Sequence, residues 1–149
     1  MSYMIVNPHR SVYLAVKSAS PVKGAHIEML TIDTPESDLI SAFWTINDVV
    51  GGAQIALKSN QELCIDLNAT SSDTVSDGTT LILGIPSSPN FTRSNLWSVG
   101  SLDNPGTASQ IESIGSAGDY VIDSGSAPTG KVWTDLNNSN QTWQVLEVQ

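Results

Sequence analysis

Apolar residues alternate with polar ones in short segments along the whole chain, and helical spacing is almost absent. The alternating segments are residues 11–17, 53–59, 62–68, 79–85, 120–124, 131–135 and 142–148. Clusters of Gly, Pro, Asn, Asp or Ser follow them, and many short strands at this spacing are typical of an all-β barrel or sandwich. Gly78 and Gly130 each stand just before a segment, where a hairpin favours positive φ. The pattern therefore predicts an all-β fold built from hairpins.

Three stretches of the chain share one layout, and each ends on a tryptophan. A strand, a short turn, an alternating strand, a glycine-led strand and a polar loop precede Trp44, Trp97 and Trp143, with a period of about 50 residues. A unit of this size cannot bury its own apolar face, whereas three units around a pseudo-threefold axis can. We therefore expect one domain of three four-strand repeats, with the three tryptophans packed inward. The approximate repeats are residues 1–49, 50–102 and 103–149.

Trp143 lies six residues from the last residue, where a frayed tail would not need it. We expect this tryptophan to close the third repeat and to seal the barrel against the strand at residues 2–6.

A shared motif precedes two of the closing tryptophans. The third repeat ends in Gln141-Thr142-Trp143, the second in Asn95-Leu96-Trp97 with a shorter amide, and the first in Ala42-Phe43-Trp44 without one. In layout and motif, the whole chain resembles a β-trefoil of the ricin B-chain type, whose repeats end in a Gln-x-Trp signature. The resemblance implies a β-trefoil fold and a non-catalytic lectin for galactose-type or N-acetylgalactosamine-type glycans. Small acidic chains with one cysteine resemble the cytoplasmic lectins of mushrooms and other fungi.

The composition of the chain limits the classes of binding partner and the cellular location that we expect. The 149 residues are 40% hydrophobic, as in a folded domain with a sizeable core, and the formal charge of −9 argues against nucleic acid and anionic membranes. No apolar run approaches the roughly 18 residues of a membrane span, so we expect no membrane insertion. The first residues lack the pattern of a secretory signal, and the single Cys64 excludes an internal disulfide. Both features fit a cytoplasmic location, although a mature secreted chain would look the same.

Two aspartates recur at the same place in the layout. Asp66 and Asp123 alternate with inward residues, so we expect both carboxylates on the outer face and open to solvent, while Ala15 holds this place in the first repeat. A carboxylate can accept hydrogen bonds from two neighbouring sugar hydroxyls. The alternative interpretation is a surface aspartate that holds its own turn, and both interpretations stay open.

The resemblance also implies a stacking aromatic residue on the third strand and an asparagine ahead of the Gln-x-Trp motif. Trp133 lies on the outer face by alternation, and an exposed indole can stack on a pyranose while amides bind its hydroxyls. The loop leaves the register of Trp133 open by two positions, and the alternative is that it covers the base of the barrel. The second repeat has Gly84 to Pro86 at the aromatic position, so Asn90 or Phe91 would substitute there. The first repeat is expected to be structural or an oligomer contact.

The candidate carbohydrate-binding residues are Asp123, Trp133, Asp135, Asn138, Asn140 and Gln141 in the third repeat, and Asp66, Asn90 and Asn95 in the second.

Catalytic chemistry is not indicated. The two histidines, His9 and His26, lack zinc-type spacing, and no nucleophile motif or phosphate-binding loop occurs. We expect no cofactor, no metal and no enzymatic activity. A single shallow sugar site would bind near the millimolar range, about −4 kcal/mol, so useful binding requires several sites or a homodimer.

Two other functions remain open. Fungal β-trefoils of this size also inhibit proteases through protruding loops. Here the loops at residues 33–41 and 87–95 are long enough to insert into a protease cleft, and Arg93 could occupy a trypsin-type pocket. The remaining possibility is a trefoil whose sugar sites have decayed and which binds only protein.

Overall fold

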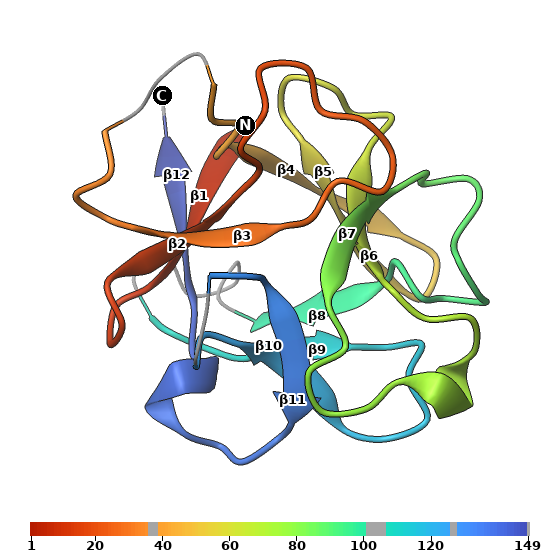
Figure 1. The fold of residues 1–149 in the computed structure, drawn as a ribbon. Helices are drawn as coiled ribbons and strands as arrows, with labels where there is room; N and C mark the ends of the chain where they lie inside the picture. Colours follow the sequence, from red (N-terminus) through yellow and green to blue (C-terminus); the bar gives the residue numbers. More distant parts are fainter. Residues whose placement is uncertain (36–38, 101–106, 126–127, 149) are drawn as a thin grey trace.

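The computed structural model describes residues 1–35, 39–100, 107–125 and 128–148, and it is an all-β domain with one sheet of twelve strands (Figure 1). The strands are β1 (Ser2–Asn7), β2 (Val12–Ala15), β3 (Glu28–Thr31), β4 (Trp44–Val49), β5 (Gly52–Leu57), β6 (Cys64–Leu67), β7 (Leu81–Gly84), β8 (Trp97–Val99), β9 (Ile111–Ser113), β10 (Tyr120–Asp123), β11 (Lys131–Thr134) and β12 (Gln144–Val148). Two short 3-10 turns, η1 (Ser72–Thr74) and η3 (Ser139–Gln141), lie between strands. No helix in these residues has the length and apolarity that a bilayer crossing requires.

Six of the strands form the barrel. Antiparallel pairing runs from β12 through β1, β4, β5 and β8 to β9. A bridge between Ser109 and Trp143 joins the β9 segment back to the start of β12 and closes the ring. The β12 strand pairs with β1 from Ser2↔Val148 to Val6↔Gln144, which confirms the expected closure by the last strand.

The other six strands form three hairpins at one end of the barrel. These are β2–β3, β6–β7 and β10–β11, and Figure 1 looks onto all three. Backbone bridges link them in a triangle, His26↔Ile82, Thr80↔Lys131 and Glu28↔Thr129. A six-stranded barrel capped by three hairpins is a β-trefoil, so the predicted fold is confirmed.

The closing tryptophans show the threefold relation most directly. Each indole N–H donates a hydrogen bond to a backbone carbonyl: Trp44 to Leu14 at 3.1 Å, Trp97 to Ile65 at 3.1 Å and Trp143 to Ile122 at 2.9 Å. All three tryptophans are 0% exposed. The residues that follow these carbonyls, Ala15, Asp66 and Asp123, are therefore structurally equivalent.

The main core follows the alternation of apolar and polar residues in the sequence. The strand β3 is an exception, because it does not alternate and is not among the predicted segments. Met29 and Leu30 are consecutive and both are buried, because Met29 faces the main core while Leu30 joins a small apolar cluster on the other side of the strand. That cluster contains Ala15 and Ala42. Burial on both faces hides the period of two.

Candidate functional site

The third repeat holds Asp123 in a defined orientation at the end of β10. Its Oδ1 accepts a hydrogen bond from the Gly125 amide at 2.6 Å, and its Oδ2 accepts one from Gln141 Nε2 at 2.9 Å. Only 7% of the residue is exposed, so the expectation of a carboxylate open to solvent is wrong. The two donors fix the carboxylate and leave each oxygen with a further lone pair.

Gln141 is itself held at both ends. Its Nε2 also donates to the Thr134 carbonyl at 2.9 Å, and its Oε1 accepts from the Leu136 amide at 2.9 Å. The turn η3 positions it, and Asn138 caps this turn by accepting from the Asn140 amide at 3.1 Å. Asn138 therefore supports the loop through its Oδ1.

Asn140 approaches the same place from η3. A methyl group placed on Gly125 would lie 3.0 Å from Asp123 Oδ1 and 3.6 Å from Asn140 Nδ2, so the carboxylate and the amide flank one glycine. The Asn140 carbonyl accepts from the Ser124 amide and hydroxyl at 2.9 and 2.8 Å. Asp123, Asn140 and Gln141 are thus brought together, as the sequence motif predicts.

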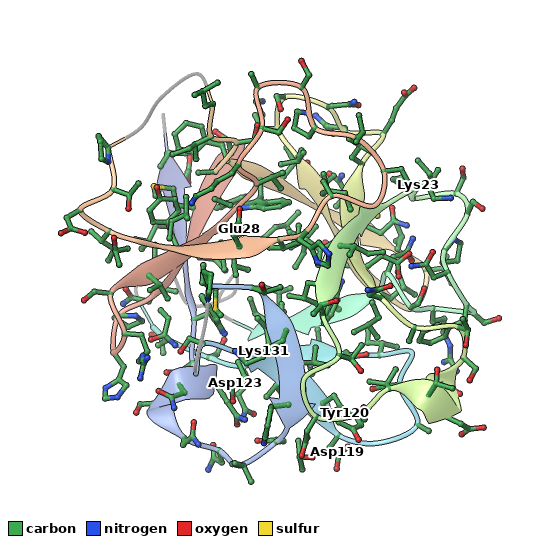
Figure 2. The ribbon with its side chains drawn as sticks, viewed as in Figure 1. Lys23, Glu28, Asp119, Tyr120, Asp123 and Lys131 are labelled. Atoms are coloured by element: carbon green, nitrogen blue, oxygen red, sulfur yellow. The ribbon has the colours of Figure 1, made fainter. Side chains whose placement is uncertain are left out.

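Lys131 is a member of this site that the sequence reasoning missed. It pairs with Asp123 across the β10–β11 hairpin (Figure 2). Its Nζ donates to the Gly125 carbonyl. Burial lowers the pKa of Lys131, the negative charge of Asp123 opposes that shift, and the positive charge of Arg10 adds to it. Alternation was a usable signal, because Lys131 and Trp133 both face away from the side of Val132.

Trp133 does not lie directly opposite Asp123 across the hairpin. It pairs with Val121, two residues before Asp123, and it is half-buried. Its ring lies beside the turn of the second repeat at Gly78, 3.9 Å from where a Cβ there would be. Asp135 also serves the loop, since its Oδ1 accepts from Gln110 Nε2 and from the Asn137 amide.

The second repeat buries its equivalent aspartate completely. Asp66 is 0% exposed, so the expected solvent-facing carboxylate is wrong here as well. Its Oδ1 accepts from the Leu67 amide at 2.8 Å and its Oδ2 from the Asn90 amide at 3.1 Å. Burial raises the pKa of Asp66, and a hydrogen bond with the Ser94 side chain is the largest opposing effect.

Gly84 explains the burial of Asp66. It is the equivalent of Trp133 in the β6–β7 hairpin, and a Cβ on it would lie 2.7 Å from Asp66 Oδ2. The carboxylate therefore occupies the space that a side chain at this position would take. Asn90 completes the cover by donating from Nδ2 to the Leu67 carbonyl at 2.8 Å.

Asn95 does not reproduce the role of Gln141. Its Nδ2 donates to the Pro86 carbonyl at 3.1 Å and lies 3.8 Å from Cys64 Sγ. The shorter side chain is used on the loop beside β7 instead of on Asp66. Phe91, the suggested aromatic substitute, packs partly buried against the main core. Burial, the largest cause, raises the pKa of the nearby Cys64 thiol to about 12, so this cysteine is unreactive at neutral pH.

The first repeat has alanines at the positions of Asp123 and Gln141. Ala15 and Ala42 belong to the small apolar cluster with Val6, Tyr13 and Leu30. A hydroxyl-rich ligand would find no side-chain hydrogen-bond partner at these two alanines.

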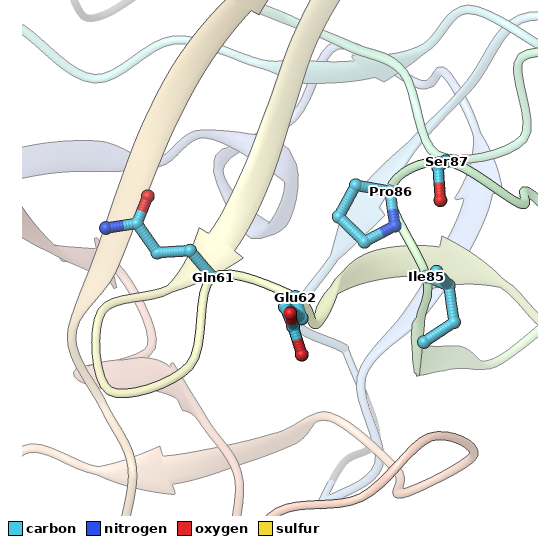
Figure 3. A pocket seen from close by; sticks show the side chains of 5 residues that line it. All are labelled: Gln61, Glu62, Ile85, Pro86 and Ser87. Carbon is cyan, nitrogen blue, oxygen red and sulfur yellow. The ribbon is translucent and has the colours of Figure 1, made fainter.

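An open groove lies elsewhere in the second repeat. It has a volume of about 330 Å³ and is lined by Gln61, Glu62, Ile85, Pro86 and Ser87 (Figure 3). The carboxylate of Glu62 and an apolar wall of Ile85 and Pro86 face one hollow. A substitution in this groove can therefore serve as a control for ligand binding at Asp123.

Arg93 adopts a turn conformation. Its φ is 64°, the Ser94 amide donates to the Phe91 carbonyl at 2.9 Å, and the Leu96 amide donates to the Arg93 carbonyl at 3.1 Å. An extended strand, as in recognition by strand addition, is not present at this residue. Across the described ranges, no group of three or more His, Cys, Asp and Glu side chains could hold a metal ion.

Comparisons with known proteins identify the fold. No model of a known protein family matches the sequence, and no curated protein matches it. The designed threefold-symmetric protein ThreeFoil is similar over 99% of both chains, with a TM-score of 0.77 and 18% identity. The Macrolepiota procera ricin B-like lectin in complex with lactose matches 99% of this chain and 96% of its own, with a TM-score of 0.70 and 16% identity. The C-half of the earthworm R-type lectin in complex with GalNAc matches 97% of each chain, with a TM-score of 0.67 and 17% identity. At these identities, the similarity establishes the β-trefoil fold.

Proposed function

We propose that the protein binds carbohydrate without catalysing a reaction, and that the site is in the third repeat. The observation that carries this proposal is the hydrogen bond from Gln141 Nε2 to Asp123 Oδ2, with the Asn140 amide close to the same face of Gly125. The amide orients the carboxylate, which is the geometric requirement for reading hydroxyl positions. Because Gln141 and Gly125 hold the carboxylate, Asp123 is not a freely solvated surface aspartate.

The chemistry of the three side chains fits a sugar. Each Asp123 oxygen has one lone pair directed to a described donor and one available, so two adjacent hydroxyls can donate to the carboxylate. Such charge-assisted hydrogen bonds are about twice as strong as neutral ones. The side-chain amide of Asn140 can donate to a third oxygen. We do not assign this role to Asp66 or Asn95, which are 0% and 2% exposed, or to Asn90, whose Nδ2 donates to the Leu67 carbonyl.

The finer assignment rests on the resemblance. We infer galactose or N-acetylgalactosamine as the sugar type, because two similar lectins were solved with lactose and with GalNAc. We further infer a cytoplasmic defence lectin of the fungal type. With one site of this kind per chain, multivalent binding would require a homodimer or larger assembly.

Titration calorimetry and ligand-observed NMR with lactose and N-acetylgalactosamine test the proposal. We expect a dissociation constant near the millimolar range, weakened at least tenfold by Asp123→Ala, a loss of about 1.4 kcal/mol. Glu62→Gln, in the open groove, is the matched control and should bind as the unmodified protein does. If the Glu62→Gln variant loses sugar binding while the Asp123→Ala variant keeps it, the site lies in the groove and not at Asp123. If the unmodified protein binds no glycan on an array, the proposed function is rejected.

A further inference from the structure

We propose that Lys131 makes the third-repeat site selective for glycans that carry an anionic substituent, a sulfate or a carboxylate. This inference rests on the proposed function, and it names the class of ligand that the same site prefers. Lys131 faces Asp123 across the hairpin, and both residues contact Gly125, one through the carbonyl and one through the amide. The cation therefore borders the carboxylate that would hold the sugar.

The fold does not require a cation at this position. Ile82 takes the equivalent place opposite Asp66, and Glu28 takes it opposite Ala15. All three hairpins make the same bridges around the threefold axis despite these different side chains. Lys131 is 9% exposed, and placing an ammonium group there costs free energy, in accord with its lowered pKa. A costly residue that the architecture does not need points to a ligand.

A second cation flanks the site from the first repeat. Arg10 is close enough to influence Lys131 electrostatically. Its turn is anchored to η3, because the Arg10 amide donates to Asn7 Oδ1 at 2.8 Å and Asn7 Nδ2 donates to the Ser139 and Asn140 carbonyls at 3.2 and 3.0 Å. Asn7 is fully buried, so this connection is firm.

The local charge is opposite to that of the whole protein. The chain has only six Lys and Arg residues and a formal charge of −9. Lys131 lies opposite Asp123, and Arg10 is close enough to influence Lys131, so these three groups together carry one net positive charge. An ammonium group has three N–H donors, and the Gly125 carbonyl takes one of them. An anionic oxygen on the sugar can accept from another, while the hydroxyls donate to Asp123.

The experiment measures a preference. Calorimetry would compare lactose with lactose sulfated or sialylated on its galactose, using the full chain in low and in physiological salt. We expect at least one anionic form to bind about tenfold more tightly than lactose, with a smaller ratio at higher salt because the Debye length shortens. The sulfated and sialylated arms distinguish sulfate from carboxylate as the anion.

Variants assign the preference to Lys131. Lys131→Gln should reduce the ratio of anionic to neutral affinity severalfold, Lys131→Arg should restore most of it, and Arg10→Gln should reduce it less. Lys58→Gln removes the same charge from an exposed position and is the matched control. If Lys131 only satisfied the Gly125 carbonyl, Lys131→Gln would change the thermal unfolding midpoint and leave the ratio unchanged.

The outcomes separate the two proposals. Binding of lactose with equal affinity for the anionic forms would overturn the selectivity and leave the sugar site in place. A preference that survives in Lys131→Gln would overturn the role of Lys131. Absence of binding to all probes would reject the proposed function, and this inference with it.

Discussion

The second and third repeats hold an aspartate at the same point of the same fold, and the two carboxylates have different surroundings. Asp123 is oriented by the side chain of Gln141, whereas Asp66 is bound by the backbone of Leu67 and of Asn90. The opposite strand presents Lys131 and Trp133 in the third repeat and Ile82 and Gly84 in the second. The comparison teaches that an identical residue at an equivalent position takes different hydrogen-bond partners according to its neighbours.

The strongest test of this difference is the truncation of Asp66. Asp66→Ala removes the acceptor of the Leu67 amide, in a buried hydrogen bond, and of the Asn90 amide, in a partly buried one, so we expect the free energy of unfolding to fall by about 2–4 kcal/mol. Urea denaturation at neutral pH measures this loss. Sugar binding by the folded fraction should be unchanged.

Asp123→Ala is the comparison variant. Its amide donor Gln141 keeps a second partner in the Thr134 carbonyl, so the cost to stability should be smaller than for Asp66→Ala. Equal costs at the two positions, together with sugar binding lost at both, would remove the distinction between a structural and a ligand-binding aspartate.

The next test concerns the space above Gly84. A Cβ there would lie 2.7 Å from Asp66 Oδ2 and 2.8 Å from Asp66 Cβ, so we expect Gly84→Ala to destabilise the fold by about 1–3 kcal/mol. The double variant with Asp66→Ala removes the clash. The cost of Gly84→Ala should then largely disappear, and a double-mutant cycle by urea denaturation would give a coupling above about 0.5 kcal/mol. Additive costs would show that Asp66 is not what opposes a side chain at this position.

A smaller change sharpens the comparison from the third repeat. Gln141→Asn shortens the amide to the length found at Asn95, so its hydrogen bond to Asp123 should be lost at a cost of about 1 kcal/mol. We expect sugar affinity to fall by about fivefold to tenfold in calorimetry, because the carboxylate is no longer held.

Gln54→Asn is the matched control for this change. Gln54 Nε2 donates to the Pro86 carbonyl at 3.0 Å, so the same shortening removes one hydrogen bond in the second repeat. Its sugar affinity should equal that of the unmodified protein. An equal loss of affinity in both variants would mean that the effect is general destabilisation.

The sequence was sufficient for the fold because its signal is repeated. Three tryptophans at even spacing and alternating strands require three equivalent units, and the indole hydrogen bonds show the same contact three times. The meeting of Asp123 with Gln141 was also predictable, since the strand end recurs in each repeat and an amide precedes the closing tryptophan in two of them.

The surroundings of the aspartates were less predictable. Alternation assigns Asp66 to the outer face of its strand, but it does not show that the loop at Asn90 covers that face. The role of Lys131 depends on the register of the β10–β11 hairpin, and a two-residue difference in register would exchange it with Trp133. Loop conformation and hairpin register depend on tertiary packing, which a single sequence does not display.

The two repeats should also differ in how pH affects their contribution to stability, which is the smallest effect we expect. The pKa of Asp66 is raised in the folded protein, so its contribution is present below the unfolded value of about 3.9 and is lost as the pH rises through the folded value. The unmodified protein should therefore lose stability relative to Asp66→Asn between pH 4 and pH 7. The measurement is urea denaturation of both proteins across this range.

For Lys131, the effect of pH on its contribution to stability has the opposite sign. Its pKa is lowered in the folded protein, so its contribution is present above the unfolded value of about 10.4 and is lost as the pH falls through the folded value. Relative to Lys131→Gln, the unmodified protein should gain stability from neutral pH toward pH 10. An anionic glycan favours the charged amine, so bound sulfated lactose should reduce this gain while lactose should not. If the gain is absent without ligand, or is reduced equally by both sugars, the ammonium group of Lys131 is not the feature that separates the third repeat from the second.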